Sequence, residues 1–393
     1  MSGPAFASGL IDPRTASAVV DLDAFATNIE TIRGHVAPVA VMVVVKADGY
    51  GHGMIECARA AREAGADWLG TATLEEALAL REAGDTGRLL AWLYGPDADL
   101  APLVAADVDV SVQSVEQISR VAMAAAIAER RARVHLKIDT GLTRNGATAK
   151  DWPEVCAAAR QAEQLGALEV VGVWSHFASA DEPGAESVEA QRAAYDQAYQ
   201  IALAAGLTPT IRHLSNSAGA LLLRQAHYDL VRLGIAAYGI DPDPGVAALA
   251  GVRLRPVMRL RAQLVNVKRI ESGTGVSYGH AWHADRPTTV GLVPLGYADG
   301  IPRHAGNTAQ AGWRGRRVPV RGKICMDQFV VELGDRDAEV GEEITLFGNG
   351  DHGEPTAADW AAWCGTIGYE IVTRIGARVP RTYRRRDLNH ARG

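Results

Sequence analysis

Several residue types are scarce in this chain of 393 residues, and each shortage excludes a class of protein. Only four cysteines are present, and they form no CxxC pair: Cys57, Cys156, Cys325 and Cys364. This spacing indicates neither a disulfide scaffold nor a metal site, and it is typical of a reducing, cytoplasmic compartment. No apolar run approaches the roughly 20 residues of a membrane span. The first residues lack the basic and long apolar regions of a signal peptide, so we expect no contact with a membrane.

Positive charge is also limited. Lysine and arginine total 40 against 46 acidic residues, a net charge of −6, which argues against nucleic-acid binding over the whole chain. Only five of the basic residues are lysines, namely Lys46, Lys137, Lys150, Lys268 and Lys323. Because arginine keeps its proton in proteins, any amine nucleophile must come from these five. The basic segment 381–386 is interpreted as a solvated tail.

Short apolar runs alternate with amphipathic stretches between about residues 37 and 240. The runs cover residues 39–45, 68–71, 89–94, 108–112, 134–138, 170–174, 210–214 and 230–235. Near-continuous apolar strands indicate a parallel sheet that is buried on both faces. Eight such strands separated by helices predict a (β/α)8 barrel. An open, doubly wound sheet is the alternative, since the strand count alone does not prove closure.

After about residue 250, apolar and polar residues alternate with a period of two. The alternation covers residues 257–270, 288–295 and 317–321, with glycine and proline between them. It predicts an antiparallel β domain with one wet face. The boundary falls in the segment 241–245, which is rich in proline, glycine and aspartate. We therefore predict a barrel domain over residues 17–247 and a C-terminal β domain over residues 248–393.

Reactive side chains gather where the predicted barrel strands end, and this end of a barrel carries active sites. Lys46 follows seven apolar residues, and desolvation there favours its neutral, nucleophilic amine. The alternatives are that Lys46 reaches solvent or pairs with Asp48. The glycine-rich turn 49–53, Ser217 at a helix start and the backbone at 234–235 are candidate phosphate elements. A poised lysine beside such elements indicates pyridoxal phosphate bound as a Schiff base.

These residues belong to a series of motifs that resembles the alanine racemases. The segment Val45-Lys-Ala-Asp-Gly-Tyr-Gly-His-Gly53 looks like the cofactor-attachment signature of that family. Matching segments follow in family order along nearly the whole chain, at residues 137–144, 174–177, 215–217, 231–235, 276–279, 296–300, 325–328 and 369–370. The resemblance implies a barrel followed by a β domain, with a first strand at about residues 5–16 packed with the C-terminal domain. It also implies a head-to-tail homodimer with shared active sites that interconverts L-alanine and D-alanine and so supplies D-alanine for peptidoglycan.

For the reaction, the resemblance implies two catalytic bases on opposite faces of the substrate Cα. Lys46 carries pyridoxal 5'-phosphate as a Schiff base and acts as one base, and Tyr278 from the partner subunit is the other. Because an ordinary tyrosine, with a pKa of about 10, is a poor base at neutral pH, His176 and Arg232 are implied to stabilise its phenolate. Arg232 also resembles the arginine that hydrogen-bonds the pyridine nitrogen. Since arginine donates but keeps its proton, the cofactor becomes a weaker electron sink.

The resemblance also implies the residues that hold the cofactor. Lys137 resembles a lysine that is carbamylated in many family members and then holds Arg144 in place. Arg144 would contact the substrate carboxylate and the phenolic oxygen of the cofactor. The alternative for Lys137 is a direct pair with Asp139. The residues that match the family's phosphate contacts are Tyr50, Ser217, Gly234, Ile235 and Tyr369. Asn216 is a neighbour of these contacts.

The substrate path is implied in the same way. Met326 of the partner subunit would bring its backbone N–H to the substrate carboxylate. Tyr297 resembles the constriction of the substrate channel. The residues that resemble those at the channel entrance are Asp181, Arg303 and Asp327.

Three other functions remain open at the level of sequence. A serine or broad-specificity racemase would have the same fold. A barrel-type pyridoxal-phosphate decarboxylase of basic amino acids shares the architecture, but such enzymes set an acidic group where Arg232 stands. A single-barrel pyridoxal-phosphate carrier lacks the second domain and its tyrosine, and this chain has both.

Overall fold

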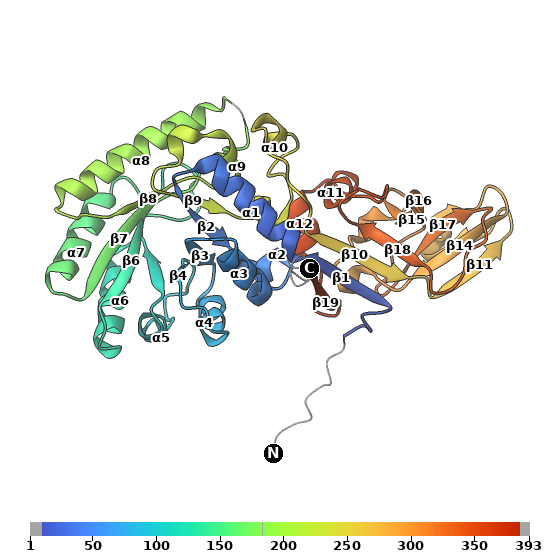
Figure 1. Ribbon diagram of the computed structural model, residues 1–393, viewed down its shortest axis with the longest axis horizontal. Helices are drawn as coiled ribbons and strands as arrows, with labels where there is room; N and C mark the ends of the chain where they lie inside the picture. The colour runs from blue at the N-terminus through green and yellow to red at the C-terminus, as the bar shows by residue number, and fades with distance from the viewer. Residues whose placement is uncertain (1–9, 183, 386–393) are drawn as a thin grey trace, which may run out of the picture.

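The computed structural model describes residues 10–182 and 184–385. A barrel of alternating strands and helices lies beside a second unit of mainly antiparallel strands, and strands β1 and β19 lie near the junction of the two (Figure 1). The fold class expected from the sequence, a (β/α)8 barrel followed by a β domain, is confirmed.

Eight parallel strands form the barrel sheet, in the order β8-β7-β6-β5-β4-β3-β2-β9. Their bounds are β2 (Ala40–Val44), β3 (Trp68–Thr71), β4 (Arg88–Ala91), β5 (Asp109–Val112), β6 (Ala132–Lys137), β7 (Leu168–Trp174), β8 (Ile211–His213) and β9 (Leu230–Leu233). Two backbone hydrogen bonds join the end strands, from Asp229 N to Arg212 O at 3.1 Å and from Arg232 N to Ser215 O at 3.0 Å. These bonds link β8 to β9, so the open, doubly wound alternative is wrong.

Helices cover the outside of the barrel (Figure 1). The helices of the barrel unit are α1 (Leu22–Val36), α3 (Met54–Glu63), α4 (Leu74–Glu82), α5 (Ala101–Ala105), α6 (Val115–Ile127), α7 (Trp152–Gln164), α8 (Glu186–Ala204), α9 (Ser217–Leu222) and α10 (Val246–Leu249). The short segment α2 (Lys46–Tyr50) has left-handed backbone inside it and does not belong to this cover. Side chains fix several starts: Asp21 caps α1, and Thr73 and Glu76 form a capping box on α4. Each covering helix turns apolar residues inward, for example Phe25, Ile29 and Ile32 of α1, which are fully buried.

The second unit is built on a nine-stranded sheet, in the order β11-β14-β17-β16-β15-β18-β10-β1-β19. Its elements are β1 (Ala16–Asp21), β10 (Met258–Gln263), β11 (Asn266–Ile270), β14 (Thr288–Val293), β15 (Gln310–Trp313), β16 (Arg316–Arg321), β17 (Phe329–Gly334), β18 (Glu343–Phe347) and β19 (Arg381–Arg384), with helices α11 (Ala357–Cys364) and α12 (Gly368–Thr373) and the small β12 (Gly275–Val276) and β13 (Trp282–His283) hairpin. Along β10, buried and half-buried residues alternate, as the period-two pattern predicts.

The continuous strand pattern over residues 257–270 is two strands, because the chain changes neighbours in its middle. Leu264 N donates to Glu342 O at 2.8 Å, and Val265 N donates to Leu292 O at 3.0 Å. β10 and β11 therefore lie in distant parts of the sheet order. The alternation of buried and exposed side chains also breaks here, since Val265 and Asn266 are both exposed. The adjacent apolar residues Leu264 and Val265 are the sequence signal of that break.

The first strand lies later in the chain than the resemblance implies. β1 begins at Ala16, and residues before it form a turn in which Asp12 accepts from Arg14 N at 2.8 Å. Residues 5–9 of the expected strand lie outside the described residues. β1 pairs antiparallel with β10 and parallel with β19. Its partners therefore belong to the second sheet, although the predicted barrel domain begins at residue 17.

The basic C-terminal segment is not a solvated tail over residues 381–385. The segment forms β19, and the guanidinium of Arg381 donates to four carbonyl oxygens, those of Gly51, Ile375, Gly376 and Val379, at 2.5–2.9 Å. Arg385 pairs with Glu63 at 2.7 Å. The basic charge of this segment predicts exposure to solvent. A guanidinium can also be buried, because carbonyl oxygens can accept its hydrogen bonds in place of water. Residue 386 lies outside the described part of the chain.

Replacing Arg381 by alanine should destabilise the protein. The change leaves the carbonyls around Arg381 without their charged donor, and we expect the free energy of unfolding to fall by about 2 kcal/mol. Urea denaturation followed by circular dichroism measures it. Arg384→Ala is the matched control, since Arg384 is an exposed residue of the same strand. Equal stability of the two variants would contradict this role of Arg381.

Candidate active site

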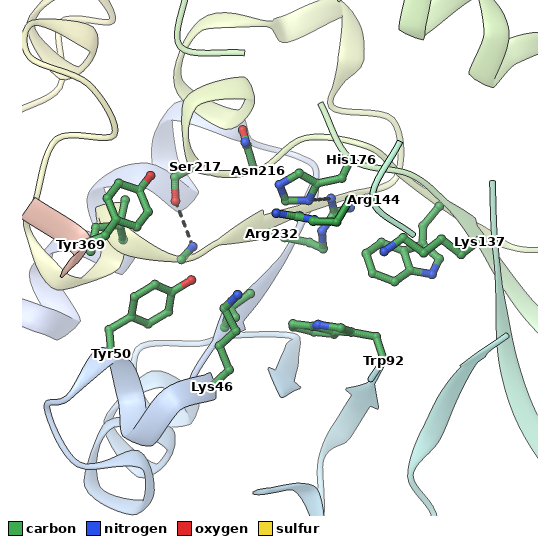
Figure 2. Close-up of a pocket in the computed structure, with 14 residues that line it drawn as sticks. Lys46, Tyr50, Trp92, Lys137, Arg144, His176, Asn216, Ser217, Arg232 and Tyr369 are labelled. Atoms are coloured by element: carbon green, nitrogen blue, oxygen red, sulfur yellow. Dashed lines mark hydrogen bonds between the residues drawn. The ribbon is translucent and has the colours of Figure 1, made fainter. Parts of the chain in front are cut away.

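A cavity of about 280 Å³ lies at the carboxyl ends of the barrel strands (Figure 2). It contains all ten residues predicted to bind the cofactor, and Lys137. The lining residues are Val44, Lys46, Tyr50, Trp92, Lys137, Arg144, Trp174, His176, Asn216, Ser217, Arg232, Gly234, Ile235 and Tyr369. Tyr369 comes from α12, so the second unit closes one side of the cavity. Val44, Trp92 and Trp174 had no predicted role, although each stands at or near the end of a predicted strand, which is the signal that could have found them.

A left-handed turn carries Lys46 and Tyr50 into the cavity. After β2, the φ angles of Ala47, Asp48 and Tyr50 are 53°, 52° and 52°, and that of Gly49 is 60°. Left-handed backbone costs about 1–2 kcal/mol per residue other than glycine, so the turn needs support. Three supports are present: Glu76 accepts from Ala47 N at 2.6 Å, Asp48 accepts from Met54 N at 2.8 Å, and Arg381 donates to Gly51 O at 2.9 Å.

Lys46 is set up as an amine that readily loses its proton. Burial lowers the pKa of Lys46, the nearby positive charge of Arg144 lowers it further, and only Glu76 opposes. Asp48, the alternative partner of Lys46, instead accepts from the backbone of Met54. The Nζ atom lies 5.9 Å from the centroid of the Tyr50 ring. These surroundings favour the neutral, nucleophilic form of the amine.

One end of the cavity is a cradle of hydroxyl and backbone N–H groups. Ser217 Oγ accepts from Gly234 N at 2.9 Å (Figure 2). A Cβ on Gly234 would come within 2.4 Å of the Tyr50 hydroxyl oxygen, so glycine is required at this close approach. Burial raises the pKa of Tyr50 and of Tyr369, which keeps both hydroxyls as neutral donors. Asn216 has a different place: it caps α9, accepting from Gly219 N at 3.0 Å.

Arg232 lies in the wall of the cavity with its two terminal nitrogens engaged. Nη1 donates to His213 O at 2.9 Å, and Nη2 donates to Ser175 O at 2.8 Å and Leu214 O at 3.0 Å. Burial lowers the pKa of Arg232 to about 10, which leaves it positively charged at neutral pH. Among the described residues, the remaining donor, Nε–H, has no partner, so it is the one that can serve a molecule in the cavity.

His176 stands beside Arg232 as a neutral imidazole. Burial lowers its pKa well below the usual range, and the charges of Arg232, Arg144 and the two cavity lysines act in the same direction. Nη2 of Arg232 lies 3.2 Å from its Nδ1. Because the guanidinium has no acceptor, an N–H at Nδ1 would face another donor, so the ring proton is on Nε2. His176 therefore offers an N–H donor on its other side.

Lys137 is a second amine of low basicity. Burial, followed by Arg232 and Arg144, lowers its pKa to about 7, with Asp139 opposing. Its Nζ lies 4.0 Å from the centroid of the Trp174 ring. The alternative pairing with Asp139 is not formed, since that carboxylate accepts from Gly141 N at 2.9 Å and Thr143 N at 3.1 Å.

The remaining predicted residues do not line the cavity. Tyr278, Met326 and Tyr297 belong to the second unit and are 69%, 54% and 41% exposed. Tyr278 lines a separate open hollow with Ser277, Gly279, His280, Cys325 and Gln328. One chain therefore does not bring the two predicted bases together. Large side chains exposed in this way are typical of a contact surface.

The three predicted entrance residues also lie outside the cavity lining. Asp181 is in the turn after β7, Arg303 begins a short 3₁₀ helix, η5 (Arg303–Ala305), and Asp327 pairs with Arg378 at 2.7 Å. Arg378 also pairs with the buried Asp299 at 3.1 Å, and Asp299 in turn accepts from Gly296 N beside Tyr297. This support of the Tyr297 segment had no sequence signal.

Residues 10–182 and 184–385 contain neither a candidate metal site nor a helix that could span a membrane. No group of three or more histidine, cysteine, aspartate or glutamate side chains is placed to hold a metal ion there. None of the helices in those ranges is long and apolar enough to cross a membrane.

Comparison with known proteins gives matches along nearly the whole chain. The family model described as alanine racemase, N-terminal domain, matches residues 20–242, and that described as alanine racemase, C-terminal domain, matches residues 257–383. The alanine racemase of Frankia casuarinae is 54% identical over 93% of this chain and 95% of its own length. That of Thermobifida fusca is 51% identical over 94% of this chain and 98% of its own length. The alanine racemase structure from Streptomyces coelicolor A3(2) superposes with a TM-score of 0.92 at 51% identity, covering 94% of this chain and 98% of that chain.

Proposed function

Since the chain belongs to the alanine racemase family, and is therefore an isomerase that acts on alanine, we propose that it uses pyridoxal 5'-phosphate and supplies D-alanine for peptidoglycan in the cytoplasm. The observation that supports the cofactor most is the cavity itself. Nine residues named from sequence motifs, spread from position 50 to position 369, line one space around Lys46. The family membership argues against the decarboxylase and carrier alternatives.

The chemistry of the lining residues fits this cofactor. The Lys46 amine matches its aldehyde, the cradle of Tyr50, Ser217 and Gly234 matches its phosphate, and Arg232 Nε–H matches an unprotonated ring nitrogen. When bound, pyridoxal phosphate supplies the electron withdrawal that makes the Cα proton of an amino acid labile. A guanidinium at the ring nitrogen limits that withdrawal, because it does not hand over its proton.

We propose that two groups of the protein then move the proton. The Lys46 amine, favoured in its neutral form by burial, removes or returns it on one face of Cα. Tyr278 of the partner subunit acts on the other face, in a head-to-tail homodimer. The exposure of Tyr278 on a single chain supports this arrangement, since the residue is free to enter a neighbour's cavity.

His176 and Arg232 are proposed to make Tyr278 of the partner subunit a usable base. The Nε2–H of His176 can donate to a phenolate, and the positive charge of Arg232 lies behind it. Both effects favour the charged form of a tyrosine.

The substrate carboxylate is proposed to meet Arg144 from one chain and the backbone N–H of Met326 of the partner subunit. Tyr297 of the partner subunit narrows the channel, and Asp181, Arg303 and Asp327 lie toward its entrance.

Lys137 should carry a carbamate. Its pKa of about 7 leaves a substantial neutral fraction at physiological pH, and only the neutral amine adds CO2. The carbamate formed is an anion beside Arg144 and Arg232, whose charges stabilise it. In ¹³CO2-equilibrated protein, a carbamate carbon signal should grow as pH rises from 6 to 8 and vanish in Lys137→Ala. Crystal density and a mass spectrum that show a bare amine in CO2-replete buffer would contradict the assignment.

A chiral assay tests the overall proposal. Enzyme stripped of any cofactor and supplied with pyridoxal phosphate should convert L-alanine into a mixture of both enantiomers, and without the cofactor it should not. L-Serine and L-lysine serve as controls. Comparable turnover of L-serine would favour the broad-specificity alternative, and turnover without pyridoxal phosphate would end the cofactor proposal.

A further inference from the structure

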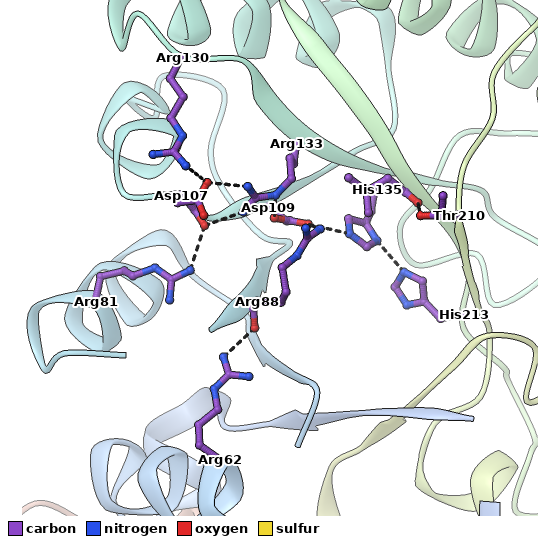
Figure 3. A network of polar contacts seen from close by, with 11 residues as sticks. Arg62, Arg81, Arg88, Asp107, Asp109, Arg130, Arg133, His135, Thr210 and His213 are labelled. Atoms are coloured by element: carbon purple, nitrogen blue, oxygen red, sulfur yellow. Dashed lines mark hydrogen bonds and ion pairs between the residues drawn. The ribbon is translucent and has the colours of Figure 1, made fainter. Parts of the chain in front are cut away.

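A buried row of polar side chains leads from Arg232 back through the barrel interior. Nη1 of Arg232 lies 3.2 Å from Nδ1 of His213, and Nε2 of His213 lies 2.9 Å from Nδ1 of His135. His135 Nε2 then lies 3.1 Å from Oδ2 of Asp109 (Figure 3). The row crosses strands β9, β8, β6 and β5. Asp109, His135 and His213 are fully buried, and no sequence motif pointed to them.

The hydrogen bonds in this row can run in only one direction. Arg232 has no acceptor, so Nδ1 of His213 must accept and the proton of His213 is on Nε2. That N–H donates to Nδ1 of His135, which places the proton of His135 on Nε2, where it donates to Asp109. A cationic His135 would instead donate from its Nδ1 to Nε2 of His213. The proton of His213 would then be on Nδ1, where the N–H would face the guanidinium of Arg232. Burial, followed by the neighbouring His135 and then the charge of Arg232, lowers the pKa of His213 well below its usual range, in agreement with a neutral ring.

Asp109 ends the row as a carboxylate. Arg133 donates to its Oδ1 at 2.6 Å, and Arg88 donates to its Oδ2 at 2.7 Å (Figure 3). Burial alone raises the pKa of Asp109, but the hydrogen bond from His135 and the charges of Arg88 and Arg133 lower it overall. Among the described residues, Arg232 makes no ion pair of its own, since its partners are carbonyls and imidazoles.

We propose that Asp109, His135 and His213 are positioning residues for Arg232. Asp109 anchors the far end of the row, and the two imidazoles connect it to Arg232 as a chain with a single donor direction. The chain holds Nη1 against β8 and so leaves Nε–H for the cavity. The inference rests on the proposed role of Arg232 as the donor to the cofactor ring.

Asp109→Asn should damage catalysis without a change in substrate contacts. One side of an amide is a donor, so the new side chain would set an N–H either against Arg133 or against the Nε2–H of His135. In the second case the chain reverses and opposes Arg232. We expect kcat to fall by about 10-fold to 100-fold, as for other residues that orient a functional group through a neighbour, while KM stays within about threefold.

Asp107→Asn is the matched control, because Asp107 also pairs with Arg133 but does not touch His135. It should change kcat by less than about twofold, since it leaves the chain to Arg232 intact. A folded Asp109→Asn enzyme with unchanged kcat would overturn the proposal, as would an equal loss of kcat in the two variants.

A neutron crystal structure of the wild-type enzyme reads the chain directly and does not depend on activity or on folding of a variant. We expect deuterium on Nε2 of His135 and of His213 and none on either Nδ1. Deuterium on Nδ1 of either ring would overturn the proposal. Since this result is independent of turnover, failure of the chain is distinguishable from failure of the proposed function, which the chiral assay tests.

Discussion

Lys46→Ala should lower kcat/KM for L-alanine by about a thousandfold or more, because it removes both the amine that holds the cofactor and one of the two bases. The variant should also lack the visible absorbance of the wild-type enzyme. Borohydride reduction of the wild type should place the cofactor on the peptide that contains Lys46, as peptide mass spectrometry will show.

Lys150→Ala is the control for this experiment, since Lys150 is exposed and lies outside the cavity. It should keep its colour and its activity. A label on another lysine, or a coloured and active Lys46→Ala protein, would contradict the assignment of Lys46.

Tyr278→Phe should lower activity by about 10²-fold to 10⁴-fold, the range for loss of a general acid or base. Mixing this variant with Lys46→Ala gives a more specific test of shared active sites. If each site takes Lys46 from one chain and Tyr278 from the partner subunit, a heterodimer of Lys46→Ala and Tyr278→Phe has one intact site. Equal mixing by refolding or co-expression should therefore restore about one quarter of wild-type activity, since half of the dimers are mixed and half of their sites are intact.

A mixture of Lys46→Ala with the double variant Lys46→Ala/Tyr278→Phe is the control, because no chain in it carries Lys46. It should stay inactive. Failure of the first mixture to gain activity, with heterodimers shown to be present, would exclude shared sites.

The sequence predicted the barrel because strands that are buried on both faces appear in it as nearly continuous apolar runs. β2 and β3 are entirely apolar or nearly so, and each predicted run overlaps an observed strand. The cavity followed from the same reasoning, since the ends of those strands carry Lys46, Lys137 and His176. The apolar pattern is therefore sufficient to predict both the buried strands and the end of the barrel that carries the cavity.

Features that depend on distant partners had no such clear pattern. The break between β10 and β11 leaves only a weak trace, the adjacent apolar residues Leu264 and Val265, because it depends on an exchange of backbone partners. The sequence alone indicates a surface charge at Arg381, because it does not show the carbonyl groups that this side chain contacts in the fold. The tautomers of His135 and His213 are fixed by Arg232 and Asp109, which lie 123 residues apart in the chain.

The strand β1 has a consequence for the order in which the molecule can form. It is synthesised well before its neighbours β10 and β19, which begin at residues 258 and 381. During synthesis it must wait, with both edges unpaired, until most of the polypeptide has emerged. A nascent barrel without the last strand would also lack Arg381, and with it one clamp on the strained turn that carries Lys46. Formation of β19, rather than completion of the barrel, is thus the point at which the nucleophile gains its full support.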